Sequence, residues 1–393
     1  MAIMDLLEGV LVGILRVAKA CDRRRTDLTD LVPAQVRRIL VISSTGIGDT
    51  LFSTPAIRAV REAYPHAYIA GMLRYRHADL FRTNPHLDAV IPYYGKYRRL
   101  LSTVAALRRG RFDVVAIAHG NDPDIIPLAY VSGARFVVRI PNESTRFRFL
   151  LSNSDLTPAS GPIPGQHALE GRLRVARLLG ARGDDRGMIL RVDPEAAGTV
   201  ATFLEGRGVR TEDPLVGFQV GASTPSRMWF GDKFAELGRR LLERHPDLRI
   251  AITGSPGERE YCRMVAQAIG ESHRVLVTAG HLTLPQVAAL VDRLSVLVAA
   301  DTGTLHMAVA LGRPAVALYA MAHSRITGPD PADPRYRIIQ KWRTCDPCYG
   351  KACPFPICME NITVDEVEAA VWEALEASAV AGDQRIGSRV RSG

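Results

Sequence analysis

The chain has 393 residues, 47% of them hydrophobic and 23% charged, and 50 Lys and Arg against 41 Asp and Glu give a net charge of +9. This length predicts two domains that each bury a core, and the composition excludes disordered and collagen-like proteins. Six cysteines are too few for a disulfide scaffold, and no apolar run reaches the roughly 18 residues that a membrane-spanning helix needs. The basic excess favours an acidic partner, such as nucleic acid, anionic lipid or a phosphorylated substrate.

Residues 1–30 are expected to form an N-terminal amphipathic helix of their own. Asp5 and Glu8 interrupt its apolar part, which disfavours a secretory signal. Basic residues follow at Arg16, Lys19 and 23–25, where they would meet lipid headgroups if the helix lay in a membrane interface. The alternative is a helix that packs on the domain or on a second subunit. The apolar residues that share one helical face are Ile3, Leu6, Leu7, Val10, Leu11, Ile14 and Val17.

Apolar strands alternate with helical patterns through the rest of the chain. Strands are expected at 38–43, 67–72, 88–92 and 112–118, and then at 214–220, 248–254, 274–278, 295–300 and 314–319. Helical patterns include 54–63, 98–109 and 363–378. This alternation predicts an α/β protein with two doubly wound parallel-sheet domains, 31–190 and 191–380, followed by a loose tail, 381–393. Because ligands bind beyond the carboxyl ends of such strands, we expect the site in the cleft between the domains.

The turn after the first strand reads Ser44-Thr45-Gly46-Ile47-Gly48-Asp49-Thr50. Its glycines permit a tight turn and close approach of a ligand to the backbone. Asp49 is expected near the start of the next helix, where the helix dipole stabilises its carboxylate, although a simple helix cap is the alternative. The turn lacks both the dinucleotide-binding glycine spacing and a Walker lysine, which disfavours those two sites.

A second turn, Asp301-Thr302-Gly303-x-x-His306, follows a buried strand in the second half. The free backbone N–H groups at the start of the following helix suit a diphosphate. Taken singly, Asp301 is more simply a helix cap and His306 a core histidine, and these structural roles are favoured.

Together these turns resemble glycosyltransferase family 9, which contains the ADP-heptose–lipopolysaccharide heptosyltransferases. The resemblance spans about residues 37–375, and it includes the segments 84–88 (Asn-Pro-His-Leu-Asp) and 280–287 as well as Ala308, Gly312 and Pro314. It implies two facing Rossmann-like domains of the glycosyltransferase B architecture, the first binding the acceptor and the second the nucleotide-sugar donor. It further implies inverting transfer without an essential metal, by a peripheral enzyme on the cytoplasmic face of the bacterial inner membrane.

The resemblance also assigns roles to residues. Asp49 matches the general base, Glu258 the ribose-binding carboxylate and Arg227 a phosphate-binding cation; a first-turn helix carboxylate is the alternative for Glu258. The sequence departs from the family twice: residues 227–230 read Arg-Met-Trp-Phe in place of Lys-x-Trp-Pro, and no Gly-Pro-Thr run follows the strand at 314–319. The implied donor-binding residues are Ser223, Thr224, Arg227, Glu258, Asp301, Thr302, Gly303 and His306.

The resemblance implies a glycolipid acceptor, expected to be anionic, and arginines of the first half are suited to hold phosphate or carboxylate groups on it. Scattered, solvated arginines are the alternative interpretation. The segment 96–111 adds six basic residues and no acid. The candidate acceptor-binding residues are Arg74, Arg76, Arg146 and Arg148.

Four cysteines, Cys345, Cys348, Cys353 and Cys358, have the spacing of a structural zinc site with four thiolate ligands. Reduced thiols and a disulfide are the alternatives, and the reaction itself is expected to need no cofactor. Because the spacing equals that of a zinc knuckle with Cys in place of His, a basic RNA-binding protein is a rival function. A catalytically idle family member that binds nucleotide or glycan as a scaffold is another. We expect the transferase, with no nucleic-acid partner.

Overall fold

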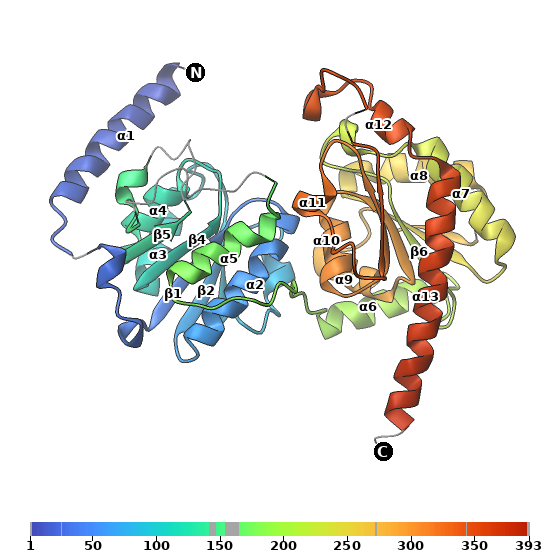
Figure 1. Ribbon diagram of the computed structural model, residues 1–393, viewed down its shortest axis with the longest axis horizontal. Helices are drawn as coiled ribbons and strands as arrows, with labels where there is room; N and C mark the ends of the chain where they lie inside the picture. The colour runs from blue at the N-terminus through green and yellow to red at the C-terminus, as the bar shows by residue number, and fades with distance from the viewer. Residues whose placement is uncertain are drawn as a thin grey trace. The chain divides into compact units, whose positions relative to one another are not determined.

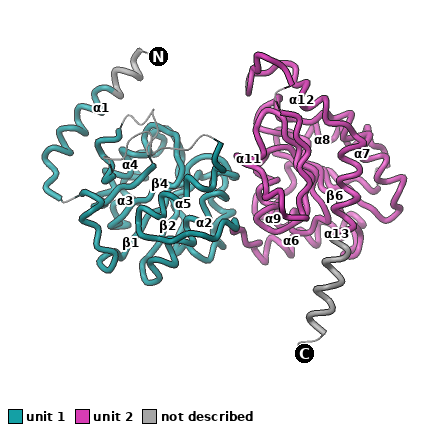
Figure 2. The backbone as a smooth tube through the Cα atoms, in the orientation of Figure 1, with its two compact units in different colours: residues 1–188 teal, residues 189–393 magenta. Residues whose placement is uncertain are grey.

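The computed structural model describes residues 2–24, 26–140, 147–153, 165–271, 273–342 and 344–390. The chain divides into two compact units, residues 1–188 and 189–393 (Figures 1 and 2). Each unit is built on one parallel sheet, which confirms the predicted fold class of two doubly wound α/β domains. No helix in the described part of the chain is long and apolar enough to cross a membrane.

Unit 1 has a five-stranded sheet in the order β3-β2-β1-β4-β5, with every pair parallel. The strands are nearly continuous apolar runs because helices cover both faces of the sheet. They are β1 (Arg38–Ser43), β2 (Tyr68–Arg74), β3 (Ala89–Tyr93), β4 (Val114–His119) and β5 (Phe136–Arg139). The predicted strands match the first four, whereas the four-residue edge strand β5 was not predicted.

Two cores lie on opposite faces of this sheet. Helices α2 (Ile47–Ala63) and α5 (Ala168–Leu178) pack on one face with alternate strand side chains. Helices α1 (Ala2–Ala20), α3 (Leu100–Gly110) and α4 (Ile125–Val131) pack on the other face, together with the short helix η4 (Arg148–Leu150). Two further short helices, η1 (Leu28–Asp30) and η2 (Pro33–Gln35), lead into β1, and η3 (Ala78–Phe81) follows β2.

Helix α2 begins seven residues earlier than its predicted start at 54 and contains Pro55. Proline has no N–H to donate to the carbonyl four residues back, which here belongs to Leu51. The hydroxyl of Thr54 donates to that carbonyl instead, at 2.7 Å. Because the Thr54 hydroxyl takes the place of the missing N–H, Pro55 does not break the helix, and α2 extends back to the turn at Gly46. Asp49 therefore lies in the first turn of α2.

Unit 2 has a six-stranded parallel sheet in the order β11-β10-β9-β6-β7-β8. The strands are β6 (Leu215–Gln219), β7 (Arg249–Thr253), β8 (Val275–Val277), β9 (Val296–Ala300), β10 (Ala315–Tyr319) and β11 (Tyr336–Gln340). The edge strand β11 was not predicted, whereas the other five match predicted strands. The longer helices are α6 (Pro194–Glu205), α7 (Gly231–Arg244), α8 (Arg259–Ile269), α9 (Leu284–Arg293), α10 (Gly303–Ala310) and α13 (Val364–Val390).

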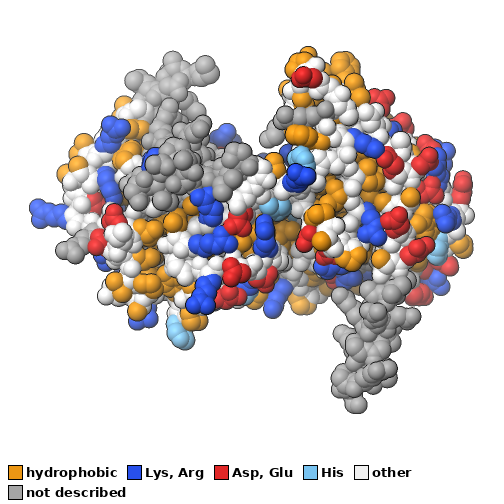
Figure 3. Space-filling model, in the orientation of Figure 1, with side chains coloured by type: hydrophobic (Ala, Val, Ile, Leu, Met, Phe, Trp, Pro, Cys, Tyr) orange, Lys and Arg blue, Asp and Glu red, His pale blue; other side chains and the backbone are white. Residues whose placement is uncertain are grey.

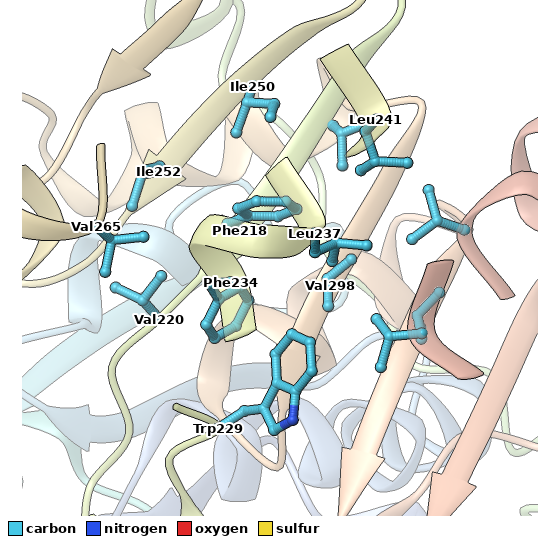
Figure 4. Close-up of a cluster of buried hydrophobic side chains, with 14 of the residues drawn as sticks. Phe218, Val220, Trp229, Phe234, Leu237, Leu241, Ile250, Ile252, Val265 and Val298 are labelled. Atoms are coloured by element: carbon cyan, nitrogen blue, oxygen red, sulfur yellow. The ribbon is translucent and has the colours of Figure 1, made fainter. Parts of the chain in front are cut away.

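One large core packs α7, α8 and α13 against the sheet of unit 2 (Figure 4). Phe218 of β6, Trp229 and Phe234 meet at its centre, with the Trp229 and Phe234 rings 4.9 Å apart at a steep angle. Helix α13 is assigned as far as Val390, and the loose tail expected from 381 stays a prediction. The remaining short helices are η6 (Pro225–Arg227), η7 (Pro256–Glu258), η8 (Gly350–Ala352), α11 (Ser324–Thr327) and α12 (Ile357–Glu360).

Candidate functional site

The carboxylate of Asp49 lies at the carboxyl end of β1 and is held from both sides. Its Oδ2 accepts hydrogen bonds from the Thr45 hydroxyl at 2.8 Å and the Gly46 N–H at 3.3 Å, which is the capping role anticipated as the alternative. Its Oδ1 accepts a hydrogen bond from the Arg172 guanidinium at 2.9 Å and lies 3.3 Å from His119 Nε2. With 35% of its side chain exposed, the carboxylate caps the turn and still faces outward.

The surroundings of Asp49 keep it ionised. Burial raises its pKa, but the charges of His119 and Arg172 and the two cap hydrogen bonds outweigh burial, so the pKa lies below the usual value. Burial lowers the pKa of His119 to about 4, assisted by the charge of Arg172. His119 is therefore neutral at pH 7, and Arg172 supplies the lasting positive charge beside the carboxylate.

Arg172 and His119 were missed by the sequence analysis. His119 is the last residue of β4, which pairs with β1, so the rule that neighbouring strand ends meet would have found it. Arg172 comes from α5, on the same face of the sheet as α2, and no local motif marks it. Its Nε is buried and has no hydrogen-bond partner among the residues that the structure describes.

A second imidazole, that of His77, lies behind the same turn. Its Nε2 is 3.2 Å from the hydroxyl of Thr50, the residue after Asp49. Burial lowers the pKa of His77 to about 4, and the nearby charge of Arg74 adds to the shift. The residues that end or follow β1, β2 and β4 thus gather at one edge of the sheet.

The candidate acceptor-binding arginines do not form one cluster. Arg74 pairs with Asp122 at 2.9 Å, which neutralises it, whereas Arg76 is exposed and donates to the Tyr75 hydroxyl at 3.0 Å. Arg148 begins η4, which packs in the core on the other face of the sheet from Arg172's helix. Arg146 lies outside the described residues.

In unit 2, the turn between β9 and α10 forms a buried charged group. The carboxylate of Asp301 is 3.3 Å from His306 Nε2 and 3.5 Å from the Arg227 guanidinium. Burial raises the pKa of Asp301, but His306 and Arg227 outweigh burial and hold this pKa below its usual value. Thr302 is the N-cap residue of α10, accepting from the Leu305 N–H at 3.4 Å, so Asp301 is not the cap.

Arg227 combines a long ion pair with an incomplete set of hydrogen bonds. Its Nε is buried and unpaired within the described part of the chain, which leaves a donor for a ligand. Two residues later Trp229 turns into the core and donates to the Ile362 carbonyl at 3.1 Å. The Arg-Met-Trp-Phe stretch therefore fixes its aromatic side chain in the core and leaves its cation at the strand ends.

Gln219, at the end of β6, ties the candidate donor-binding elements together, and the sequence analysis missed it. Its Oε1 accepts from the Thr304 hydroxyl of α10 at 2.9 Å, and its Nε2 donates to the Gly221 carbonyl at 3.0 Å. Gly221 in turn lies directly against the Glu258 carboxylate. A Cβ added at position 221 would lie only 1.9 Å from Glu258 Oε1. A polar residue at the end of an otherwise apolar strand was the available signal.

Glu258 adopts the helix-capping arrangement anticipated as its alternative role, accepting from the Ser255 N–H at 2.6 Å. Its other oxygen lies against Gly221, at the ends of β6 and β7. Of the two hydroxyl residues expected to bind phosphate, Ser223 is exposed, and the Thr224 hydroxyl is 3.2 Å from that of Ser226.

The four-thiolate zinc site predicted from cysteine spacing is not assembled. No group of three or more His, Cys, Asp or Glu in the described ranges is placed to hold a metal ion. Three of the sulfurs meet different polar groups: Cys358 lies 3.2 Å from the Thr344 hydroxyl, Cys348 accepts from the Gly350 N–H, and Cys353 donates to the Phe355 carbonyl. The loop nevertheless adjoins the donor side of unit 2, because η8 packs against η6, which carries Arg227.

A groove of about 390 Å³ lies between α6 and α9. Arg210, Arg293 and Arg313 line it at the amino ends of the strands, and Arg313 is already paired with Asp292 at 2.8 Å. It is therefore at the opposite end of the sheet from Asp301 and Gln219.

Comparison with known proteins gives a consistent result. The model of glycosyltransferase family 9 (heptosyltransferase) matches residues 164–358. Lipopolysaccharide heptosyltransferase 2 of Salmonella typhimurium is 24% identical over 308 residues, which cover 74% of this chain and 85% of that protein. Lipopolysaccharide heptosyltransferase 1 of Pseudomonas aeruginosa is 25% identical over 343 residues, covering 81% and 88%.

Solved structures show the same fold. The E. coli ADP-heptose LPS heptosyltransferase II superimposes with a TM-score of 0.69 at 21% identity, covering 87% of this chain and 99% of that one. A family 9 glycosyltransferase from Veillonella parvula gives 0.70 at 19% identity, covering 87% and 97%.

Proposed function

Since the chain belongs to glycosyltransferase family 9, we propose that it transfers a heptose from ADP-heptose to a lipopolysaccharide core or a similar glycolipid, with inversion. The relatives that it matches along most of its length are named as lipopolysaccharide heptosyltransferases, which supports the sugar and the acceptor class. A solved relative named for ADP-heptose supports the donor. In this proposal the enzyme works at the cytoplasmic face of the inner membrane, as a peripheral protein.

The observation that carries the mechanism is the ionised, accessible carboxylate of Asp49. As the general base it takes the proton of the acceptor hydroxyl while that oxygen attacks the anomeric carbon of the donor. The bond to the nucleoside diphosphate breaks in the same displacement, which inverts the configuration. Arg172 positions the carboxylate and keeps it ionised, because their contact is a charge-assisted hydrogen bond of 2.9 Å.

Negative charge grows on the departing diphosphate and needs stabilisation. The backbone N–H groups of Thr302 and Gly303, at the start of α10, and the Arg227 guanidinium supply positive partners at the end of β9. With these groups the proposal assigns no step to a metal ion. Glu258 accepts from the ribose hydroxyls through the oxygen that does not cap η7.

The donor assignment is tested by the thermal stability of the protein with ADP, UDP, GDP and a short RNA, side by side. A nucleotide at a hundred times its dissociation constant stabilises the protein by about 2.7 kcal/mol, so selectivity is measurable. We expect ADP to stabilise selectively. Selective stabilisation by UDP or GDP would replace the donor, and a response to RNA alone would sink the transferase assignment.

The base assignment is tested by Asp49→Ala, with transfer from ADP-heptose to a core acceptor as the readout. We expect turnover to fall by about 10²–10⁴-fold, the usual contribution of a general base, while stabilisation by ADP is unchanged. Asp79→Ala, at an exposed carboxylate paired with Arg82, is the matched control. Near-normal turnover in Asp49→Ala would contradict the base assignment, whereas a wild-type protein that binds ADP but shows no turnover would favour the idle scaffold.

A further inference from the structure

Helix α1 is apolar on two faces, and only one of them is used within the protein. Leu15 is buried in the core of unit 1, and Leu11 and Val12 pack beside it. The other face keeps Val10, Ile14 and Val17 at 55%, 61% and 66% exposure. Because these three residues are spaced i, i+4 and i+7, they form one continuous stripe along the helix.

A second exposed apolar group lies at the start of α3. Leu101 is 86% exposed and Leu100 is also exposed, which is unusual for adjacent leucines at the beginning of a helix. The preceding loop carries the exposed cations Lys96, Arg98 and Arg99. The guanidinium of Arg99 lies over the Tyr94 ring at 4.2 Å, so the cations of this loop flank an aromatic surface as well.

These two groups belong to one layer of unit 1, in which α4 lies between α1 and α3. Arg108 of α3 donates to the Val131 carbonyl at the end of α4, at 3.0 Å. Lys19 of α1 lies over the Tyr130 ring of the same helix, at 5.8 Å. All three helices contribute to the core on that face of the sheet, so their outer faces point away from it together (Figure 1).

The positive charge of this layer is concentrated in and before α3, whereas α1 carries Asp5 and Glu8 near its start and Arg16 and Lys19 near its end. The segment 96–111 has six basic residues and no acid. At the end of α1, the carboxylate of Asp22 is already paired with Arg24 at 2.6 Å, and Asp122 and Asp124, behind α3, bond to Arg74 and Tyr93. Figure 3 shows Lys and Arg side chains beside hydrophobic ones on the visible face of unit 1, with some Asp and Glu side chains among them.

We propose that this layer, the exposed stripe of α1 and the amino end of α3 with its basic loop, binds the surface of an anionic lipid bilayer. Exposed apolar side chains flanked by cations are the pattern of an interfacial element, in which the apolar part enters the acyl boundary and the cations meet lipid phosphates. The uncompensated positive charge selects a bilayer rather than a second copy, which would set the same cations against each other. This inference rests on the proposed function, because an enzyme that acts on a lipid-linked acceptor meets that acceptor at a membrane.

The test is co-sedimentation with vesicles of phosphatidylcholine, alone or with phosphatidylglycerol added, without donor or acceptor. We expect the full chain to bind the anionic vesicles and to be released by salt. Val10→Ser, Ile14→Ser and Val17→Ser together, or Leu100→Ser with Leu101→Ser, should weaken binding about tenfold, as loss of buried apolar area requires. Met264→Ser, at an equally exposed apolar residue of α8 in unit 2, is the matched control.

A second pair of variants tests the charges. Arg98→Gln with Arg109→Gln should reduce binding and its salt dependence, whereas Arg239→Gln, at an exposed arginine of α7, should change neither. Thermal unfolding of each variant at the wild-type temperature shows that it is folded.

Two outcomes would overturn the proposal. One is a wild-type protein that stays in the supernatant with anionic vesicles. The other is an α1 variant that binds vesicles normally but changes from dimer to monomer in light scattering, which would assign the stripe to a second copy. Transfer to a soluble, delipidated acceptor is measured separately, so a failed transferase assignment and a failed membrane assignment give different results.

Discussion

The carboxylate of Asp49 depends on one buried cation for its charge state. Burial alone would raise the pKa of a half-buried aspartate, and the neutral His119 beside it cannot offset this at pH 7. Arg172 keeps its charge at pH 7 and, with the Thr45 and Gly46 hydrogen bonds, opposes the effect of burial on Asp49. It also adds to the lowering of the His119 pKa, which burial mainly causes. The guanidinium of Arg172 also donates to the Ala168 carbonyl and lies 5.9 Å from the centre of the Phe52 ring, so contacts on its own side of the sheet hold it beside Asp49.

Arg172→Gln should therefore raise the pKa of Asp49. Above the new pKa the carboxylate is still ionised, so the expected result is an acid limb of the kcat profile displaced to higher pH, with kcat reduced and the donor KM unchanged. Arg172→Lys should restore part of the displacement by returning the charge. The measurement is kcat and KM for ADP-heptose between pH 4 and 8.

The matched control is Arg177→Gln on the same helix, where the guanidinium pairs with Glu170 and not with Asp49. An Arg172→Gln enzyme with reduced kcat but an unmoved acid limb would assign Arg172 a merely structural role.

At the scale of single elements, the strands that could be predicted from the sequence are those with a continuous apolar run. β1 has the predicted bounds because its residues are buried on both faces and read as one apolar run. The missed strands β5 and β11 are edge strands, as are β3 and β8, which were predicted. They differ from these in sequence: β5 has only three apolar residues before Arg139, and Arg337 and Gln340 interrupt the apolar residues of β11.

The residues of the candidate site also differ in whether the sequence alone could predict them. Asp301 directly follows β9 and Asp49 lies in the turn after β1, so both were candidates from position, and the family resemblance then gave them roles. Arg172 and Gln219 were not, because their partners come from distant segments and only the tertiary fold brings them together.

The turn after β6 gives a prediction on packing. An alanine at 221 would place its Cβ on the Glu258 carboxylate, which must then leave the Ser255 N–H. We expect Gly221→Ala to lower stability by about 1 kcal/mol, the usual value of a lost cap, and to raise the donor KM. Urea unfolding and KM for ADP-heptose are the measurements.

Gly257→Ala is the control for this change, because its Cβ would meet nothing closer than 4.0 Å. A raised KM without loss of stability would mean that Glu258 acts on the donor without its capping role, and no effect on either would remove Glu258 from the donor site.

The cysteine loop gives a prediction on reactivity. Burial raises the pKa of Cys262 to about 12, so its thiol should stay inert in the native protein. The half-buried thiols of Cys345, Cys348, Cys353 and Cys358 should react with a thiol reagent in the native state without prior treatment. Thiols that react only after a chelator removes bound metal would restore the zinc site predicted from their spacing.

At the scale of the whole molecule, unit 1 contains a built-in sensitivity to acid. His77 is buried, and its pKa is about 4 in the folded protein against an ordinary value of 6.5. Between these values the unfolded chain takes up a proton that the folded one excludes, so stability is complete above pH 6.5 and falls as pH is lowered toward 4. Asp49 also loses stability on acidification but at lower pH, because its depressed pKa contributes stability above the usual pKa of an aspartate, and this is lost as pH falls toward the folded pKa.

The shift of His77 corresponds to roughly 3 kcal/mol, of which about 2 kcal/mol is lost by pH 5. His77→Gln keeps a polar partner for the Thr50 hydroxyl but does not titrate, so it should remove about this much of the difference in unfolding free energy between pH 7 and pH 5. Urea denaturation followed by circular dichroism at the two pH values measures it, with His273→Gln, at an exposed histidine of unit 2, as control. An unchanged pH dependence in His77→Gln would show that His77 is already charged at pH 7 or is solvated in the folded protein, and the acid sensitivity would then have to come from His119 and its neighbours.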